Sequence, residues 1–190
     1  EKLTRILTHD VERIERLITD YSQMLKDEAA LSKEQMNKID LKYIVQSVVD
    51  DFNSIYVEKR GVTINLNIDN KIKNFNILGI ENRVEQILAN LLDNAISFSK
   101  DNQKVLVELQ SNQNDMIILR VIDQGHGFKE KKLNKIFDRF YSNRPDKFGE
   151  HSGLGLNIVK NLVELHGGII VASNNPDKIG ARVEISFPKT

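Results

Sequence analysis

The sequence predicts a two-layer α/β sandwich: a mixed sheet of about five or six strands, covered by helices on one face and preceded by a long bundle or coiled-coil helix. Three observations lead to this fold class. Apolar residues recur at helical spacing in several segments, apolar and polar residues alternate in several short runs, and neither Pro nor Gly interrupts residues 1–36.

The first segment carries an apolar seam whose residues are spaced alternately four and three apart, the pattern of a coiled coil or helix bundle. A seam of this kind needs a partner, so we expect residues 1–36 to form a dimerising bundle helix. A helix that caps the following domain is the alternative. The seam consists of Leu7, Val11, Ile14, Ile18, Tyr21 and Leu25.

Helices and strands alternate after residue 36. Asp40 is a typical N-cap residue in front of an apolar helical face, and Gly61 is placed to end that helix. The elements predicted in this part are a helix from Leu41 to about Ile55, strands at 62–68 and 75–78, and a helix at 81–99.

The second half begins with two strands around a turn-prone segment. Residues 123–152 then contain two glycine clusters, several cations and one short helical pattern. A segment of this length is typical of a functional lid or of a disordered segment, and a lid would cover about residues 128–152. The elements predicted here are strands at 105–109 and 116–122, a short helical pattern at 133–137, a helix at 154–166 ended by Gly167 and Gly168, and strands at 169–172 and 182–187.

The composition argues against several classes of function. The 190 residues include 27 Lys and Arg against 27 Asp and Glu, and this balance argues against a nucleic-acid binder, which needs a basic surface. There is no Cys, which fits a reducing compartment. No apolar run approaches the roughly 20 residues that span a bilayer, so we expect no direct membrane contact.

Two asparagines lie one turn apart in the helix predicted at 81–99. Asn90 and Asn94 would share one face of that helix. Asn is a mediocre helix former, and its amide oxygen is a neutral ligand that suits Mg²⁺. The alternative is that both are ordinary hydrogen-bonded helix residues.

A carboxylate and two glycines follow the strand predicted at 116–122. Asp123 at a strand end can accept a hydrogen bond from a planar donor such as the adenine amino group. Gly125 and Gly127 permit positive φ and let a flat ring approach the backbone. An ordinary turn is the alternative, and the segment is not a dinucleotide-binding fingerprint because the third glycine is missing.

A glycine-rich loop leads into the helix predicted at 154–166. Backbone N–H groups at such a helix start, together with the positive end of the helix dipole, form an anion site. A flexible hinge is the alternative. The loop contains Ser152, Gly153, Leu154 and Gly155. A metal-binding amide, an adenine acceptor and a phosphate site are together the parts needed to hold Mg·ATP.

With these motifs in this order, the sequence resembles the ATP-binding catalytic domain of bacterial sensor histidine kinases, within the ATPase class shared with Hsp90, gyrase B and MutL. The resemblance covers about residues 40–190, and residues 1–36 resemble the second helix of the dimerisation domain. Asn90 and Asn94 match the N box, Asp123, Gly125 and Gly127 the first glycine box, Phe137 to Tyr141 the F box, and Gly153 and Gly155 the second glycine box.

The resemblance implies a role for each matched residue. Asn94, with Asn90, would bind Mg²⁺ and through it the triphosphate, and Asp123 would accept a hydrogen bond from adenine. Phe137 and Phe140 would anchor the lid. The residues implied in nucleotide binding are Asn90, Asn94, Phe98, Asp123, Gly125, Gly127, Arg139, Ser152, Gly153, Leu154 and Gly155, with Arg144 and Lys147 as further cations for the phosphates.

The sequence departs from the family pattern at two places. Where the family often has a Lys that reaches the phosphates, this chain has Ser97, and Ser152 or a lid cation would have to compensate. His9 and Asp10 begin like the phosphoacceptor motif, but no Pro follows and His9 lies off the apolar seam. We therefore expect the phosphoacceptor helix to lie upstream, in a longer protein of which this chain is a piece.

The function implied by the resemblance is the catalytic part of a two-component sensor kinase. It would bind Mg·ATP and pass the γ-phosphoryl group to a histidine outside this chain, for relay to an aspartate of a response regulator. The longer protein would be a homodimer through the N-terminal helix, and this part would be the cytoplasmic domain of a bacterial inner-membrane protein. The alternatives are a serine/threonine kinase of the anti-sigma type and a non-catalytic, nucleotide-gated dimerisation module.

The other histidines carry weaker expectations. His126 lies in the first glycine loop and His151 in the predicted lid, where each could be simple surface. His166 is expected at a helix C-terminus, where a charged imidazole would gain from the helix dipole.

Overall fold

The computed structural model describes most of the chain from residue 34 onward. The residues described are 11, 14, 15, 18, 19, 21, 22, 25, 34–112, 114–130, 132–139, 141, 153–175 and 179–190. All of the described residues between 11 and 25 are helical. Among the described residues, no helix combines the length and the apolar character that a membrane crossing requires.

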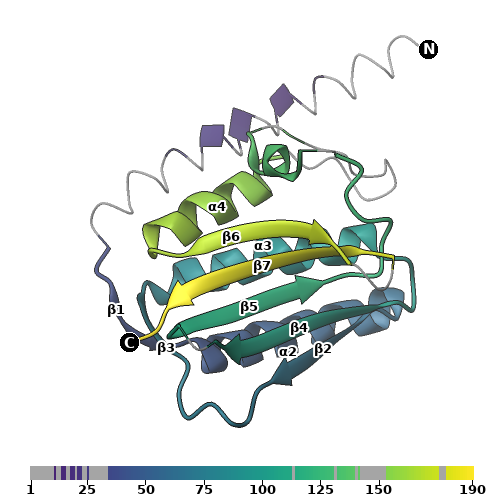
Figure 1. The fold of residues 1–190 in the computed structure, drawn as a ribbon. Helices are drawn as coiled ribbons and strands as arrows, with labels where there is room; N and C mark the ends of the chain where they lie inside the picture. The colour runs from purple at the N-terminus through teal and green to yellow at the C-terminus, as the bar shows by residue number, and fades with distance from the viewer. Residues whose placement is uncertain are drawn as a thin grey trace, which may run out of the picture.

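Five strands form one mixed sheet in the order β2-β4-β5-β7-β6 (Figure 1). β2 is parallel to β4, and the remaining neighbours are antiparallel. The strands are β2 (Thr63–Ile68), β4 (Lys104–Ser111), β5 (Met116–Ile122), β6 (Ile169–Asn174) and β7 (Ala181–Pro188). The mixed five-stranded sheet agrees with the predicted fold class.

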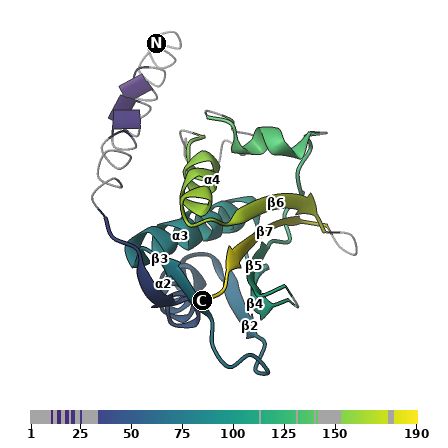
Figure 2. The same ribbon diagram turned by 60° about the vertical axis from the view of Figure 1, so that its left-hand side comes forward.

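Three α-helices lie together on one face of this sheet (Figure 2). They are α2 (Leu41–Arg60), α3 (Glu81–Phe98) and α4 (Gly155–Leu165), and a short 3₁₀ helix, η1, covers Leu133–Phe137. The sequence predicted each of these elements within a few residues, and β5 at its observed bounds. The two layers follow from the sequence because each helix has a single apolar face to bury.

The predicted caps of α2 are confirmed. The Asp40 carboxylate accepts a hydrogen bond from the Lys42 N–H at 2.9 Å, which satisfies one backbone donor in the first turn. At the other end Gly61 has φ +63° and donates its N–H to the Val57 carbonyl. These two local signals fix the length of the helix that covers the β2 end of the sheet.

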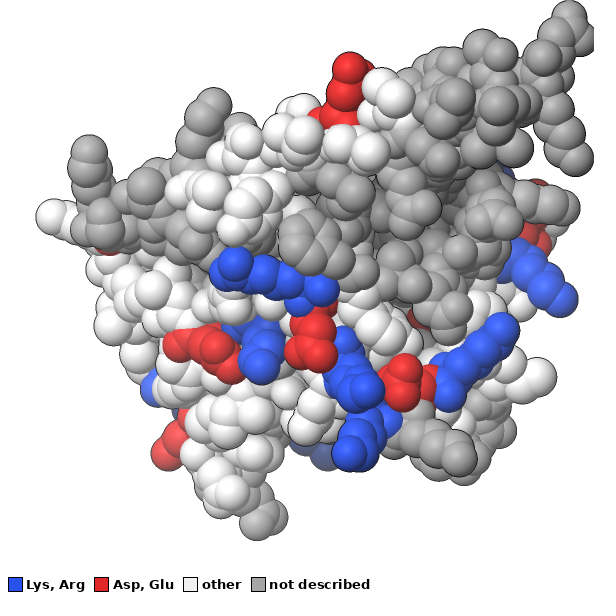
Figure 3. Space-filling model, turned by 90° about the horizontal axis from the view of Figure 1, so that it is seen from above, with Lys and Arg blue, Asp and Glu red and all other residues white. Residues whose placement is uncertain are grey.

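The outer face of the sheet carries charged pairs instead of a second helical layer. Arg120 donates to Glu184 at 2.6 Å and to Gln110 at 2.9 Å, and Arg182 also pairs with Glu184. Burial alone would raise the pKa of Glu184, but hydrogen bonds from these two guanidinium groups outweigh it and hold that pKa below its ordinary value. In Figure 3 acidic and basic side chains are likewise interspersed and not gathered by sign.

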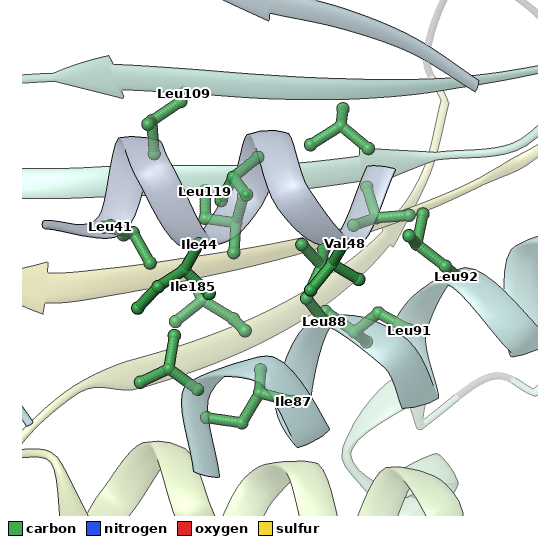
Figure 4. Packing of buried hydrophobic residues seen from close by; sticks show 14 of the residues in the cluster. Leu41, Ile44, Val48, Ile87, Leu88, Leu91, Leu92, Leu109, Leu119 and Ile185 are labelled. Carbon is green, nitrogen blue, oxygen red and sulfur yellow. The ribbon is translucent and has the colours of Figure 1, made fainter. Parts of the chain in front are cut away.

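The core lies between the helices and the inner face of the sheet (Figure 4). Residues of α2 and α3 that recur every three to four positions meet strand residues that alternate inward. These buried residues include Ile44 and Val48 of α2, Leu88 and Leu91 of α3, and Leu109, Leu119 and Ile185 of the strands. The packing fixes α3 against β4, β5 and β7.

The start of the domain differs from the prediction in two ways. Residues 34–36 are not helical, so the prediction of a helix over 1–36 extends too far toward the C-terminus. A strand, β1 (Asn37–Asp40), was missed, and it pairs antiparallel with β3 (Asn76–Gly79) in a separate two-stranded sheet. The strand predicted at 75–78 therefore exists but lies outside the main sheet, because its partner comes from the segment before α2.

A bidentate ion pair holds the segment that precedes β1. The Arg83 guanidinium at the start of α3 donates to both carboxylate oxygens of Glu34, at 2.7 and 3.0 Å. The hydrogen bond from Arg83 is the main reason that the pKa of Glu34 is lowered. The chain before β1 is thus attached directly to α3.

Shortening Leu88 tests the packing between α3 and the sheet. Leu88 is fully buried, so Leu88→Ala should leave a cavity and lower the free energy of unfolding by about 2–5 kcal/mol in urea denaturation. Tyr43→Ala, at a helix position that is 67% exposed, should change it by less than about 0.5 kcal/mol. Equal effects of the two variants would contradict the described core.

Candidate functional site

The three clusters singled out in the sequence come together at one end of the sheet. The loop after β5 touches the last turn of α3, because a Cβ added at Gly125 would lie 2.6 Å from the Phe98 carbonyl oxygen. The start of α4 touches the middle of α3, since a Cβ added at Gly155 would lie 3.3 Å from Oδ1 of Asn90. The C-terminal half of α3 therefore contacts both glycine segments.

Asp123 follows the last residue of β5 and is 7% exposed. Its Oδ1 accepts hydrogen bonds from the Gly125 N–H at 2.8 Å and from the Ala181 N–H at 3.0 Å. Among the described residues, all hydrogen bonds to this carboxylate use Oδ1, which leaves Oδ2 as an acceptor for another donor. Burial raises the pKa of Asp123 in spite of these two backbone donors.

Three glycines allow the backbone to close around Asp123. Gly127 has φ +74°, a conformation that L-residues rarely adopt. Gly180, which precedes β7, has φ +141°, and a Cβ there would overlap the Asp123 carbonyl oxygen. The sequence analysis predicted roles for Gly125 and Gly127 but missed Gly180, because the atom that excludes its Cβ is on a residue far away in the chain.

Asn174, at the end of β6, is a second residue that the sequence analysis missed. Its Oδ1 accepts the Phe128 N–H at 2.7 Å, and its Nδ2 donates to the Phe128 carbonyl at 3.0 Å. These two bonds pair with the Phe128 backbone as a neighbouring strand would. Phe128 is the first residue of the predicted lid. The sequence separation of 46 between the partners explains why no local pattern indicated this pairing.

Asn90 and Asn94 of α3 are both half-buried. Nδ2 of Asn90 donates to the Gln86 carbonyl at 3.0 Å, one helical turn back, so the amide nitrogen is engaged within the helix. Its Oδ1 is the atom that lies near Gly155. Among the described residues no group of three His, Cys, Asp or Glu side chains is placed to hold a metal.

Ser97 and Phe98 close the last turn of α3. Ser97 is buried, and its hydroxyl donates to the Asn94 carbonyl at 2.8 Å, so it serves the helix and not the site. The Phe98 ring packs edge-on against the His126 ring, with 5.3 Å between the centroids. His126 thus contacts Phe98, whereas the sequence indicated only that this histidine could be simple surface.

The second glycine segment begins α4. Gly153 has φ +70°, and the buried residue Leu154 accepts the first helical bond from the Ile158 N–H at 2.8 Å. The N–H groups of the first turn, starting at Gly155, have no partners within the helix because of helix geometry. They are available to an anion, with the positive end of the helix dipole behind them.

The base of the predicted lid is anchored by η1. Ile136 and Phe137 are buried in a small cluster with Ala172 of β6. Nδ2 of Asn157 in α4 donates to the Phe137 carbonyl at 2.9 Å. Among the other predicted residues, Arg139 is exposed, while Phe140, Arg144, Lys147, His151 and Ser152 lie outside the described residues.

The predicted position of His166 at a helix C-terminus is confirmed, because it is the C-cap residue of α4, but its burial was not foreseen. The side chain is 5% exposed, its Nε2 accepts the Ile80 N–H at 3.0 Å, and its Nδ1 lies 2.6 Å from the Leu162 carbonyl. This bonding pattern requires the neutral tautomer with the proton on Nδ1. His166 joins the end of α4 to the start of α3 and does not act as a surface cation.

Comparison with known proteins agrees with this fold. Residues 79–190 match the model of the family described as histidine kinase-, DNA gyrase B-, and HSP90-like ATPase. The chain belongs to this ATPase family, and its similar proteins are sensor histidine kinases.

Three relatives illustrate the likeness. Sensor protein ChvG of Agrobacterium fabrum is 37% identical over 99% of this chain, which spans 33% of that protein's length. The mycobacterial sensor histidine kinase MprB has a TM-score of 0.68 at 24% identity, covering 80% of this chain and 97% of its own. Histidine kinase ThkA, solved in complex with response regulator protein TrrA, has a TM-score of 0.71 at 23% identity, covering 100% of this chain and 51% of its own.

Replacing Asp123 by Asn tests the electrostatic state of the site. A carboxyl group whose folded pKa is raised contributes stability at low pH and loses it as the pH rises through that pKa. Asn keeps an oxygen for the two backbone donors without the buried charge, so Asp123→Asn should be at least as stable as the wild type at neutral pH. The difference in thermal unfolding should shrink as the pH falls toward the ordinary range of a carboxyl group. A variant that is less stable at neutral pH and recovers in acid would contradict the raised pKa.

Proposed function

We propose that this chain binds Mg·ATP and transfers the γ-phosphoryl group to a histidine on a dimerisation domain. One observation carries the proposal: an isolated carboxylate acceptor, two helix amides and a helix N-terminus meet around α3. Each is an ordinary feature alone, and each is suited to a different part of one nucleotide.

The adenine base is assigned to the end of β5. Oδ2 of Asp123 would accept a hydrogen bond from the amino group, and the backbone bonds to Oδ1 hold the carboxylate in one orientation. A Cβ at Gly125 would crowd both the Phe98 carbonyl and the Asp123 carboxylate, so a glycine is needed where the two approach each other. The aromatic ring of Phe98 would supply an apolar wall, with Gly127 completing the turn.

A magnesium ion is assigned to Asn94 and Asn90. The amide oxygens of these two side chains fit Mg²⁺, which accepts neutral oxygen ligands, keeps several waters and takes further oxygens from phosphates. Bound Mg²⁺ would supply positive charge that bridges and orients the phosphate oxygens. The amide of Asn90 is held by Gln86, so its oxygen is positioned before any ligand arrives.

The triphosphate is assigned to the start of α4. Gly153 and Gly155 permit a close approach of the phosphates, and the free N–H groups after Leu154 donate to them. Arg139 and Ser152 are proposed as additional contacts, with Arg144 and Lys147 as further lid cations. Ser97 is excluded from this role, because its hydroxyl is bonded to the Asn94 carbonyl inside the helix.

The acceptor histidine is proposed to lie outside this chain, since His9 lacks the proline that follows the family's phosphoacceptor. The N-terminal helix would dimerise, and its apolar residues Val11, Ile14, Ile18 and Leu25 are exposed. The phosphohistidine would then serve a response regulator, as supported by the complex of ThkA with TrrA. We assign the chain to the cytoplasmic part of a bacterial inner-membrane protein; it spans about a third of the length of ChvG.

Nucleotide titration tests the site assignment. Asp123→Asn and Asn94→Ala should each weaken Mg·ATP binding at least about tenfold in calorimetry, because each removes a polar partner of the nucleotide. Asn82→Ala is the matched control, since Asn82 is an exposed asparagine on the same helix. Unchanged affinity of either site variant would contradict the assignment.

Phosphoryl transfer tests the reaction. The chain should not label itself with γ-phosphate, and it should label an added dimeric helix pair that carries a phosphoacceptor motif. The product should be acid-labile and stable in base, as phosphohistidine is, and His9→Ala should transfer at the same rate. An acid-stable product would favour a serine/threonine kinase, and ATP binding without any transfer would favour a non-catalytic module.

A further inference from the structure

We propose that Arg60 is a positioning residue for the adenine end of the site. It holds the last turn of α3, and through that turn it places Phe98 and the glycine loop next to Asp123. This inference rests on the proposed function and deepens it, because it concerns recognition of the base.

Arg60 is the last residue of α2, and its guanidinium crosses to the end of α3. Its Nη1 donates to the Ile96 carbonyl at 2.8 Å, and its Nη2 donates to the Ser99 carbonyl at 2.7 Å. Its Nε donates to Asp101 at 2.9 Å. The side chain is 16% exposed, so these bonds form in a largely water-free contact.

The carbonyl groups at the C-terminal end of α3 accept hydrogen bonds from Arg60, which lies outside that helix. The last carbonyl groups of a helix have no partners within it, and the last turn of α3 contains no basic residue of its own. The Ser99 N–H and hydroxyl satisfy the Ala95 carbonyl, and Arg60 adds a positive charge at the negative end of the helix dipole. The planar fork of arginine lets one side chain engage two carbonyls two to three residues apart.

The turn that Arg60 holds is the turn that forms the adenine wall. Phe98 lies between Ile96 and Ser99, the two residues whose carbonyls accept from Arg60. The Phe98 carbonyl is the atom that a Cβ at Gly125 would meet, and the Gly125 N–H donates to Asp123. A loosened turn would therefore move Phe98 and Gly125 together, while the start of α4 stays in place.

The alternative is that Arg60 only stabilises the fold. The two roles differ in selectivity, because a positioning residue for the base affects ATP but not a ligand that consists of phosphates alone. Arg120→Met is the matched control: its arginine is also half-buried and multiply hydrogen-bonded, but it lies on the outer face of the sheet. Asp101→Asn removes only the partner that is 70% exposed, and such exposed pairs contribute little.

Calorimetry with Mg·ATP and with magnesium tripolyphosphate tests the proposal. Arg60→Met should weaken ATP binding about tenfold and change tripolyphosphate binding less than about twofold, as expected for the loss of two charge-assisted bonds near the base. Arg60→Lys, which keeps the charge but not the fork, should give a smaller loss with the same selectivity. Arg120→Met and Asp101→Asn should leave both affinities near the wild-type values.

Amide hydrogen exchange gives a readout that needs no nucleotide. Exchange at the Gly125 N–H should become faster in Arg60→Met and Arg60→Lys than in Arg120→Met. An unchanged ATP-to-tripolyphosphate ratio, or unchanged Gly125 exchange, would overturn the role of Arg60 even if ATP binds. Faster Gly125 exchange in a chain that binds no ATP would support the structural link while refuting the proposed function.

Discussion

The carboxylate of Asp123 joins three segments that are far apart in the sequence. Its Oδ1 accepts from Gly125, two residues ahead, and from Ala181, 58 residues ahead. Gly125 in turn packs against the Phe98 carbonyl at the end of α3. The end of β5, the start of β7 and the end of α3 are therefore fixed around one buried charge, whose burial raises its pKa. A carboxyl group whose pKa is raised by burial is common at functional sites, and this supports the adenine acceptor that we propose.

The helix that carries Asn90 and Asn94 is held at both ends by other elements. At its start, Arg83 binds Glu34, and the Ile80 N–H donates to the buried His166. At its end, Arg60 donates hydrogen bonds to the Ile96 and Ser99 carbonyls. In the function that we propose, fixing α3 in this way would hold Asn90 next to Gly155 before a nucleotide binds, which would limit the ordering that binding requires.

Local patterns were sufficient for most of the fold, and they singled out the segments from which we propose the site. Asp40 and Gly61 mark the ends of α2 by short-range capping chemistry, and a short apolar run defines β5 at its observed bounds. The residues that were missed or misjudged depend on distant partners. Gly180 meets Asp123, and His166 bonds to Ile80 across 86 residues. Strand β1 was missed because its four residues are too few to show a period, and its partner lies beyond α2.

The central claim is that one nucleotide contacts all three clusters at once. The most direct measurement is a titration of ¹⁵N-labelled protein with a non-hydrolysable ATP analogue and Mg²⁺, followed by NMR. The account predicts that the amides of Gly125 and Gly155 and the side-chain amides of Asn90 and Asn94 shift together, with one common dissociation constant. Shifts confined to a single cluster, or clusters that titrate with different constants, would contradict it.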